Sequence, residues 1–148
     1  MGARREGRVA AMHVLYQLDT ARDFNEVELA LARYFMHQPT DEEVIEPAPL
    51  PEDVRDFASE LCCGVVEHRE TIDEALERAS TNWRVERMSR VDRNVLRVAA
   101  YELMFCPEVP GRVAINEALE LGKSYGTTDS RPFINGVLDK LRRSLPVS

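Results

Sequence analysis

Apolar side chains recur at helical spacing through almost every segment of this chain, and this constrains its fold more than any other feature. In the first segment, Val9, Met12 and Tyr16 mark one face of a helix with a period of 3.6 residues. The same spacing predicts further helices over about residues 27–35, 54–65, 72–79, 89–105, 113–125 and 130–145. No segment shows the strict alternation of a half-buried strand. The sequence therefore predicts an all-α fold of about seven helices, packed as a helical bundle.

Two stretches need separate interpretation. The pair Asn135-Gly136 is typical of a β-hairpin turn, but the apolar residues around it repeat with the helical period. We therefore place it inside the last helix, where Gly136 is expected to allow the close approach of a neighbouring helix. Residues 38–51 contain four prolines and four acidic residues, and we expect a loop there.

The length of 148 residues is that of one ordinary domain. The chain contains no apolar run of about 18 residues, and the stretch after its basic start lacks the continuous apolar core of a signal peptide. We therefore expect a cytoplasmic protein with no membrane partner.

Sequence motifs of the common enzyme classes are missing from the chain. It has no glycine-rich phosphate loop, no HExxH and no GxSxG, and its histidines and cysteines do not stand at metal-ligand spacing. We therefore expect no catalytic residue, no metal site and no cofactor.

Charge is unevenly distributed along the sequence. The net charge is −7, and residues 23–60 carry eleven acidic residues against two arginines. Basic residues gather instead in the first eight residues, in residues 84–97 and in the last third of the chain. If the fold brings these segments together, an acidic protein can still present a basic face to a polyanion.

Two long blocks of sequence resemble the bacterial NusB family of transcription antitermination factors. The first block is WRVERMSRVDRNVLR at residues 83–97, with its continuation at 99–103. The second block comprises residues 113–118, 123–126, 129–130 and 133–139, and a weaker third block at the start contains Arg4, Arg5, Arg8, Ala11, Leu15 and Tyr16. The resemblance covers about two-thirds of the chain, and residues 20–60 contribute little to it.

The resemblance implies an all-α protein of two packed bundles, here roughly residues 1–80 and 81–148 of a single RNA-binding domain over residues 1–148. It implies binding of single-stranded, boxA-type RNA in ribosomal RNA transcripts, together with the ribosomal protein NusE. It also implies action on the RNA polymerase elongation complex with other Nus factors. A homodimer that buries the arginines is an alternative state of the free protein.

The resemblance also implies the residues of the RNA-binding site. Arginine pairs with phosphate and stacks on bases, and the arginine-rich start of the family matches Arg4, Arg5 and Arg8. Glu6 stands where family members can carry another arginine, so we expect a lower affinity and a weaker salt dependence. Asp92 matches a position that faces NusE. The other residues implied to contact RNA are Tyr16, Arg97, Lys123, Asp129, Ser130, Phe133 and Asn135.

Most of these residues have a structural alternative. The N-terminal arginines can form a frayed, solvated end, and Asp92 can be a surface acid without a role. Arg90, Arg93 and Arg97 form one basic stripe at helical spacing, whose alternative is a solvated face paired with Glu86 and Asp92. The alternatives for the rest are core packing (Tyr16, Phe133), a helix cap (Ser130) and a buried hydrogen bond between helices (Asn135). Trp83 is assigned to structure, as a plug in the junction between the bundles.

Two other classes of function are the alternatives to an RNA-binding factor. One is a protein-interaction adaptor without sequence-specific RNA binding, and a strong loss of RNA binding on addition of salt would separate the two. The other is the accessory domain of a ribosomal RNA cytosine methyltransferase, which would require a catalytic partner chain.

Overall fold

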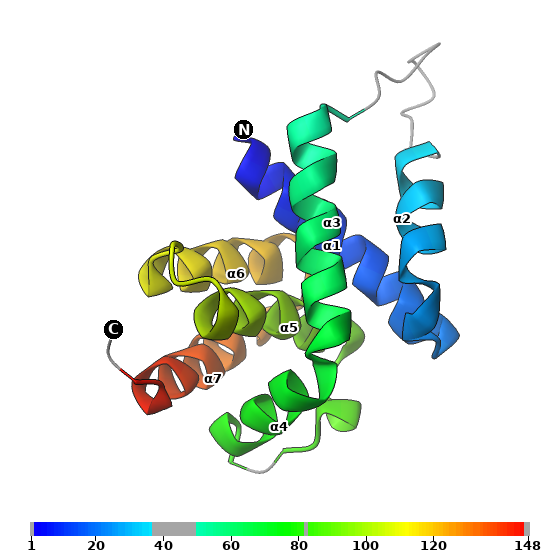
Figure 1. Cartoon of the computed structure of the whole chain (residues 1–148). Coiled ribbons are helices and arrows are strands. Elements are labelled where there is room, and N and C mark those ends of the chain that lie inside the picture. Colours follow the sequence, from blue (N-terminus) through cyan, green and yellow to red (C-terminus); the bar gives the residue numbers. More distant parts are fainter. Residues whose placement is uncertain (1, 37–49, 82, 147–148) are drawn as a thin grey trace. The chain divides into compact units, whose positions relative to one another are not determined.

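A computed structural model of the chain describes residues 2–36, 50–81 and 83–146, and these residues form helices joined by short connections (Figure 1). The expected loop at 38–51 lies almost wholly outside the described residues. The all-α prediction of about seven helices is confirmed. The elements of the described part are α1 (Ala3–Ala21), η1 (Phe24–Glu26), α2 (Val27–Met36), α3 (Glu52–Glu67), α4 (Arg69–Ala79), η2 (Val85–Arg87), α5 (Arg90–Phe105), α6 (Gly111–Tyr125) and α7 (Ser130–Ser144).

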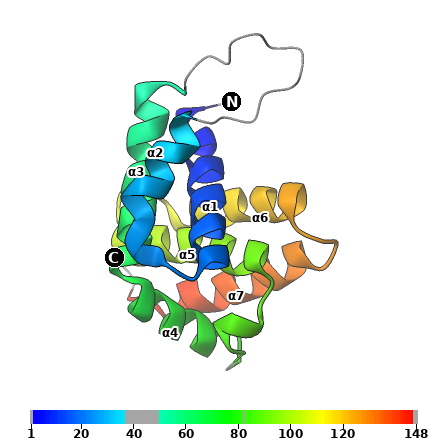
Figure 2. The same ribbon diagram turned by 90° about the vertical axis from the view of Figure 1, so that its right-hand side faces the viewer.

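The first of two compact units covers residues 1–63 and contains α1, α2 and most of α3. Helix α1 ends at Ala21, and the next residue, Arg22, adopts a left-handed conformation with φ 57°. The carboxylate of Asp23 then accepts a hydrogen bond from the Asn25 amide. The chain reverses there, so α1 and α2 lie side by side with opposite directions (Figure 2). The core of this unit includes Ala10, Ala11, Met12, Val14, Leu15, Leu18, Leu31, Val54, Phe57, Ala58, Leu61 and Cys62.

The second unit covers residues 64–148, and α5 lies at its centre in contact with α4, α6 and α7. Every side chain of α5 from Asn94 to Ala100 is buried, so this helix is enclosed around its whole circumference. The hydroxyl of Ser89 caps its first turn by accepting the Asp92 amide at 3.1 Å. The expectation of a central helix at about 89–105 is therefore confirmed.

The two units meet between Cys63 and Gly64, within α3, whereas the sequence suggested a division near residue 80. Helix α4 accounts for the difference, because it packs on α5 and α7 of the second unit. Its buried stripe consists of Ile72, Ala75, Leu76 and Ala79. Periodicity predicts that such a stripe is buried, but it does not predict which helices cover it.

Helix α7 runs without a break through Asn135 and Gly136, as the helical period predicts. The expected role of Gly136 is wrong, however. A Cβ atom added there would meet no heavy atom of the described residues within 4 Å, so no helix of the described part approaches this position closely. Close approaches occur instead at other glycines, among them Gly7, Gly64 and Gly122, where an added Cβ would clash with side chains of Phe57, Tyr101 and Ile134.

Candidate nucleic-acid interface

Helix α1 fixes how the N-terminal arginines are presented. Arg4 and Arg8 stand one turn apart, and their guanidinium carbons lie 4.3 Å and 5.5 Å from the ring centroid of Phe57 on α3. Arg4 and Arg5 are exposed, whereas only 5% of Arg8 is exposed. Such cation–π contacts contribute about 0.5–1 kcal/mol at exposed sites. The buried ring of Phe57 therefore orients two arginines while the exposed Arg4 keeps surface for a ligand.

The same helix carries Tyr16, whose side chain is 37% exposed. Tyr16 follows Arg5 by eleven positions, which places the two residues within about 20° of one another around the helix axis and roughly 16 Å apart along it. Tyr16 therefore lies on the surface near the core boundary, so the alternative of full core packing is wrong. Arg5 and Tyr16 share one exposed face of α1.

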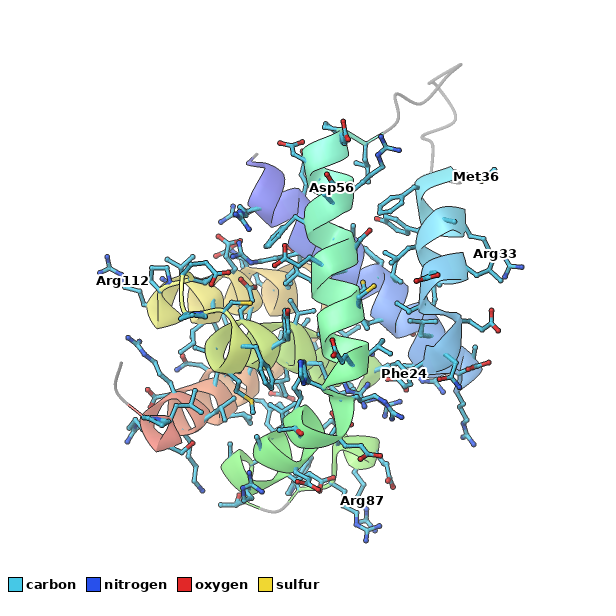
Figure 3. All side chains as sticks on the ribbon, in the orientation of Figure 1. Phe24, Arg33, Met36, Asp56, Arg87 and Arg112 are labelled. Carbon is cyan, nitrogen blue, oxygen red and sulfur yellow. The ribbon has the colours of Figure 1, made fainter. Side chains whose placement is uncertain are left out.

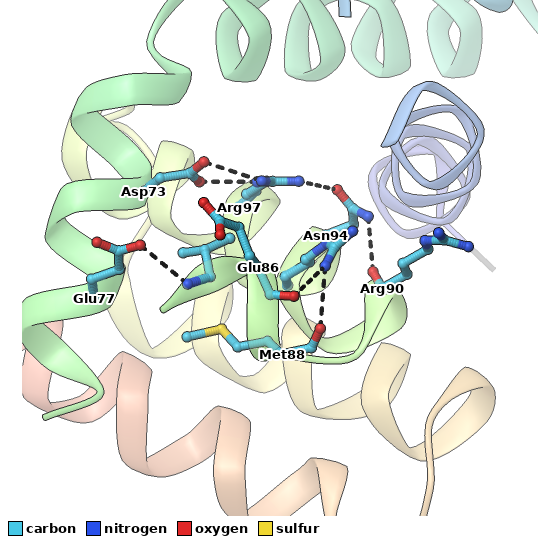
Figure 4. A network of polar contacts seen from close by, with 9 residues as sticks. Asp73, Glu77, Glu86, Met88, Arg90, Asn94 and Arg97 are labelled. Atoms are coloured by element: carbon cyan, nitrogen blue, oxygen red, sulfur yellow. Dashed lines mark hydrogen bonds and ion pairs between the residues drawn. The ribbon is translucent and has the colours of Figure 1, made fainter. Parts of the chain in front are cut away.

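Arg97 occupies a different environment from the one that its place in a basic stripe suggested. Its guanidinium donates to both carboxylate oxygens of Asp73 on α4, at 2.9 Å and 3.1 Å, and to the Asn94 side-chain carbonyl at 3.0 Å (Figure 4). Only 4% of the residue is exposed. Arg97 therefore ties α4 to α5, and contact with RNA stays a prediction that this geometry does not favour.

The expected basic stripe on α5 is not a continuous solvated face. Arg90 is exposed, Arg93 is half-buried and Arg97 is buried. The guanidinium of Arg93 donates to the backbone carbonyls of Glu86 and Met88, at 3.2 Å and 3.3 Å (Figure 4). The prediction of one solvated stripe is wrong because other helices enclose α5. The later residues of the stripe therefore contact protein rather than solvent.

Asp92 lies in the first turn of α5, where a carboxylate interacts favourably with the helix dipole. The residue is half-buried, and its Oδ1 atom is inaccessible and has no hydrogen-bond partner among the described residues. A buried acceptor without a donor costs about 1–3 kcal/mol. The predicted contact with a partner protein stays a prediction, and this oxygen is an acceptor that a partner's donor would satisfy if it reached the atom.

The connection between α6 and α7 is organised by Ser130. Its hydroxyl is buried and accepts the Thr127 amide at 2.9 Å, and an added Cβ on Gly126 would lie only 2.2 Å from it. Ser130 is the first residue of α7, and its hydroxyl accepts an amide that precedes the helix, so it fixes the turn before α7 and is not the expected helix cap. Asp129 stands at the N-cap with an exposed side chain that makes no capping hydrogen bond.

Lys123, Phe133 and Asn135 complete the predicted set in this unit. Lys123 is exposed in the last turn of α6. Asn135 is exposed, so the alternative of a buried hydrogen bond between helices is wrong. Residues two positions apart in a helix point in directions about 200° apart around the helix axis. Asn135 and the half-buried Phe133 therefore point to different sides of α7. Asp129 and Phe133, one turn apart, share a side.

Trp83 does not form the buried plug that we expected from its sequence position, since 57% of its surface is exposed. Its indole lies beside the phenyl ring of Phe133, with ring centroids 5.9 Å apart and planes inclined by 50°. Sequence periodicity does not predict this pairing, because fifty positions and the elements η2, α5 and α6 separate the two aromatic residues along the chain.

The predicted RNA-binding residues divide between the two units. Arg4, Arg5, Arg8 and Tyr16 belong to the first unit, and the others belong to the second. Exposed cations also occur outside the predicted set, and the side chains of Arg33, Arg87 and Arg112 extend away from the ribbon (Figure 3). Exposure and charge alone therefore do not select the interface.

The residues that the structure describes contain neither a helix that could span a membrane nor a cluster of metal-ligating side chains. No helix among them is both long and apolar enough to cross a membrane. Within the same ranges, no group of three or more histidine, cysteine, aspartate or glutamate side chains is placed to hold a metal ion.

Comparisons with known proteins identify relatives over the whole chain. The NusB family model matches residues 5–143. The transcription antitermination protein NusB of Myxococcus xanthus is 44% identical over 147 residues, which are 98% of either chain. The fold is shared with T. maritima NusB, with a TM-score of 0.75 and 33% identity over 95% of this chain and 91% of that one.

A further solved structure holds the antitermination factors NusB and NusE in complex with dsRNA. It matches with a TM-score of 0.79 and 26% identity, over 98% of this chain and 99% of that one. The resemblance inferred from the sequence blocks is therefore confirmed by both kinds of comparison. The family model and the full-length relative together show that the chain belongs to the NusB family.

Proposed function

We propose that this chain is an RNA-binding transcription antitermination factor that binds single-stranded, boxA-type RNA together with the ribosomal protein NusE. It would act on the RNA polymerase elongation complex with other Nus factors. The observation that carries the proposal is the match, over nearly the whole chain, to a NusB that was crystallised with NusE and RNA. The family's relatives are named as antitermination proteins, in agreement with the expectation that the chain is not an enzyme. A factor acting on nascent transcripts would work in the cytoplasm.

We propose that the exposed members of the predicted set contact RNA directly. Arg4, Arg5 and Lys123 supply positive charge at the exposed surface, where it can attract phosphate. Tyr16 and Phe133 supply aromatic rings for unstacked bases, while Asp129 and Asn135 supply polar groups for base edges or sugar hydroxyls. The whole chain would act as one RNA-binding domain that draws on both units.

The buried members have a different proposed part. Arg8, Arg97 and Ser130 expose almost no surface. We propose that they hold the interface in shape: Arg8 through Phe57, Arg97 through Asp73, and Ser130 through the turn before α7. Direct contact of these three residues with RNA would require local rearrangement of the bonds described above.

NusE is proposed to meet the second unit near the start of α5. Asp92 lies there with one buried acceptor that lacks a donor within the described ranges. A hydrogen bond to a charged donor contributes about 1.5–3 kcal/mol, so one donor from a partner would repay local adjustment of this turn. Joint binding of RNA and NusE would then raise the apparent affinity for each, without any new contact inside this chain.

Fluorescence anisotropy of a labelled boxA-type RNA, titrated with the chain in the presence and absence of NusE, tests the proposal. The expected result is tighter binding of the boxA-type RNA than of a scrambled single strand, strengthened by NusE. The variant R4A/R5A should bind more weakly. It is preferable to a variant that includes Arg8, because the Arg8 side chain is buried and its loss could destabilise the fold.

The matched control is R33A/R78A, which removes the same charge from exposed positions outside the proposed site. It should keep most of the wild-type affinity. Binding of a double-stranded RNA is measured in parallel, because the related NusB–NusE complex contains dsRNA. Equal affinity for boxA-type and scrambled RNA with and without NusE would contradict the proposal. The protein-interaction adaptor would then be the leading alternative.

A further inference from the structure

The backbone is anchored on both sides of Trp83 although the indole faces solvent. Before it, Thr81 adopts a left-handed conformation with φ 58°, and the buried hydroxyl of Ser80 lies 3.1 Å from the Trp83 carbonyl oxygen, to which it donates. After it, the buried Val85 donates its amide to a carboxylate oxygen of Glu77 at 3.2 Å. The backbone around Trp83 is therefore anchored to α4, so its exposure is not that of a loose loop.

Phe133 restricts where the indole can lie but does not cover it. The ring centroids are 5.9 Å apart and the ring planes are inclined by 50°. The phenyl ring therefore does not lie flat on the indole. With 57% of Trp83 exposed, a large part of its aromatic surface remains accessible. An anchored, accessible aromatic surface of this kind is what a stacking ligand requires.

The surroundings favour a nucleic-acid base over an apolar protein surface. Trp83 is followed by the exposed Arg84, and Phe133 is preceded by the exposed Arg131 and Pro132. These exposed neighbours in the sequence add two guanidinium groups and no large apolar side chain. A nucleotide presents a flat base beside a phosphate, which matches an exposed aromatic ring that is followed directly in the chain by an exposed arginine, as Trp83 is by Arg84.

We propose that Trp83 and Phe133 together form a stacking site for one unpaired base of a single-stranded RNA, with Arg84 contacting a neighbouring phosphate. This inference rests on the proposed function and extends it, because it adds Trp83 and Arg84 to the RNA-binding surface. Stacking tolerates any base, so the site contributes affinity and register rather than base identity.

The chain offers a direct probe, because Trp83 is its one tryptophan. Intrinsic tryptophan emission of the full-length protein is followed while an unlabelled, single-stranded boxA-type RNA is added. Stacking predicts a saturable change in emission and protection of the indole from acrylamide, both with the dissociation constant measured in parallel by anisotropy. In the variant F133L, RNA should still bind, but with a smaller change in emission and a lower affinity.

Affinity measurements on variants provide the second readout. Loss of one base–aromatic stack predicts that W83L weakens RNA binding roughly 5- to 100-fold, whereas W83F keeps most of the affinity. The control M36A removes an exposed apolar side chain from α2 and should bind RNA like the wild type. Because Trp83 is largely exposed, W83L should unfold thermally near the wild-type temperature, which separates a lost contact from a lost fold.

The outcomes distinguish this inference from the proposed function. If anisotropy shows RNA binding while the tryptophan emission stays unchanged and W83L binds as tightly as the wild type, the stacking site is overturned and the proposed function stands. If NusE alone alters the emission and RNA does not, the aromatic pair is a protein contact and the inference is likewise overturned. If no RNA binds in anisotropy under any condition, the proposed function fails first.

Discussion

At the scale of single residues, the ion pair between Arg97 and Asp73 should be the most sensitive point of the second unit. The variant D73A leaves a guanidinium that is 4% exposed without its carboxylate, and removing one partner of a buried pair is strongly destabilising. We expect the free energy of unfolding to fall by about 2–3 kcal/mol, less than for a fully buried pair because Asp73 is partly exposed. Urea unfolding measures this loss.

The neighbouring residue supplies the control for that measurement. Glu74 also lies on α4 but is exposed, so E74A makes the same kind of truncation on the same helix. Its effect should be within about 0.5 kcal/mol of zero. Equal destabilisation by D73A and E74A would show that the Arg97 pair does not stabilise the unit beyond an ordinary surface contact.

His13 predicts a dependence of stability on pH in the first unit. The imidazole ring of His13 stacks on the ring of Tyr34, with ring centroids 6.2 Å apart. Burial lowers the pKa of His13 from its usual value of 6.5. The unfolded chain therefore binds a proton at higher pH than the folded chain does. The resulting stability is fully present above pH 6.5 and is lost as the pH falls through 6.5 towards the folded pKa.

Urea unfolding of the wild type and of H13Q at neutral and mildly acidic pH tests this expectation. The wild type should lose more stability between the two conditions than H13Q does, because glutamine does not titrate. Any loss shared by both proteins comes from other groups. An identical loss in the two proteins would contradict the effect of burial on His13.

Residue roles were the part of the molecule that sequence reasoning predicted least well. The sequence pattern offers Glu86 and Asp92 as ion-pair partners of the basic stripe that contains Arg97, but the partner of Arg97 is Asp73, 24 residues away on another helix. Trp83 was expected to be buried because it is large and apolar, whereas its backbone anchors leave it exposed. In both cases the deciding contact is tertiary, and spacing along the chain carries no information about it.

At the scale of helices, two glycines give opposite predictions. Replacing glycine by alanine inside a helix normally stabilises it by up to about 1 kcal/mol. Gly136 on α7 has open space around it, so G136A should show that gain. At Gly7 on α1, an added Cβ would lie 2.6 Å from Phe57 Cδ1 and 3.3 Å from its Cβ, so G7A should destabilise by about 1–3 kcal/mol.

Thermal and urea unfolding of both variants measure the contrast. Because Phe57 also carries Arg4 and Arg8, G7A should weaken RNA binding as well, and G136A should leave it close to the wild-type value. A stabilising effect of G7A would mean that α1 and α3 have room to separate, against the close contact described above.

The helices themselves were largely predictable from the sequence. Most of the helices bury an apolar stripe, and such a stripe repeats every 3.6 residues whatever covers it. For the same reason the stretch around Asn135-Gly136 was correctly predicted as helix. The covering partner was not predictable, so the sequence assigned α4 to the N-terminal half, although it packs on α5 and α7.

At the scale of the whole molecule, the proposed function must overcome a net charge of −7. Long-range electrostatics oppose the approach of RNA, and local arginines and lysines must supply the attraction. On a single strand, each phosphate that is neutralised contributes about −0.7 to the slope of log affinity against log salt concentration. The number of contacts can therefore be counted from salt dependence without a structure of the complex.

The salt dependence of binding to a single-stranded boxA-type RNA tests the central claim most directly. The account predicts a clearly negative slope for the wild type and for R33A/R78A. For R4A/R5A, the slope should be less negative by up to about 1.4 units, the contribution of two phosphate contacts. An affinity that does not change with salt, or an R4A/R5A slope equal to that of the wild type, would contradict RNA binding through the exposed N-terminal arginines.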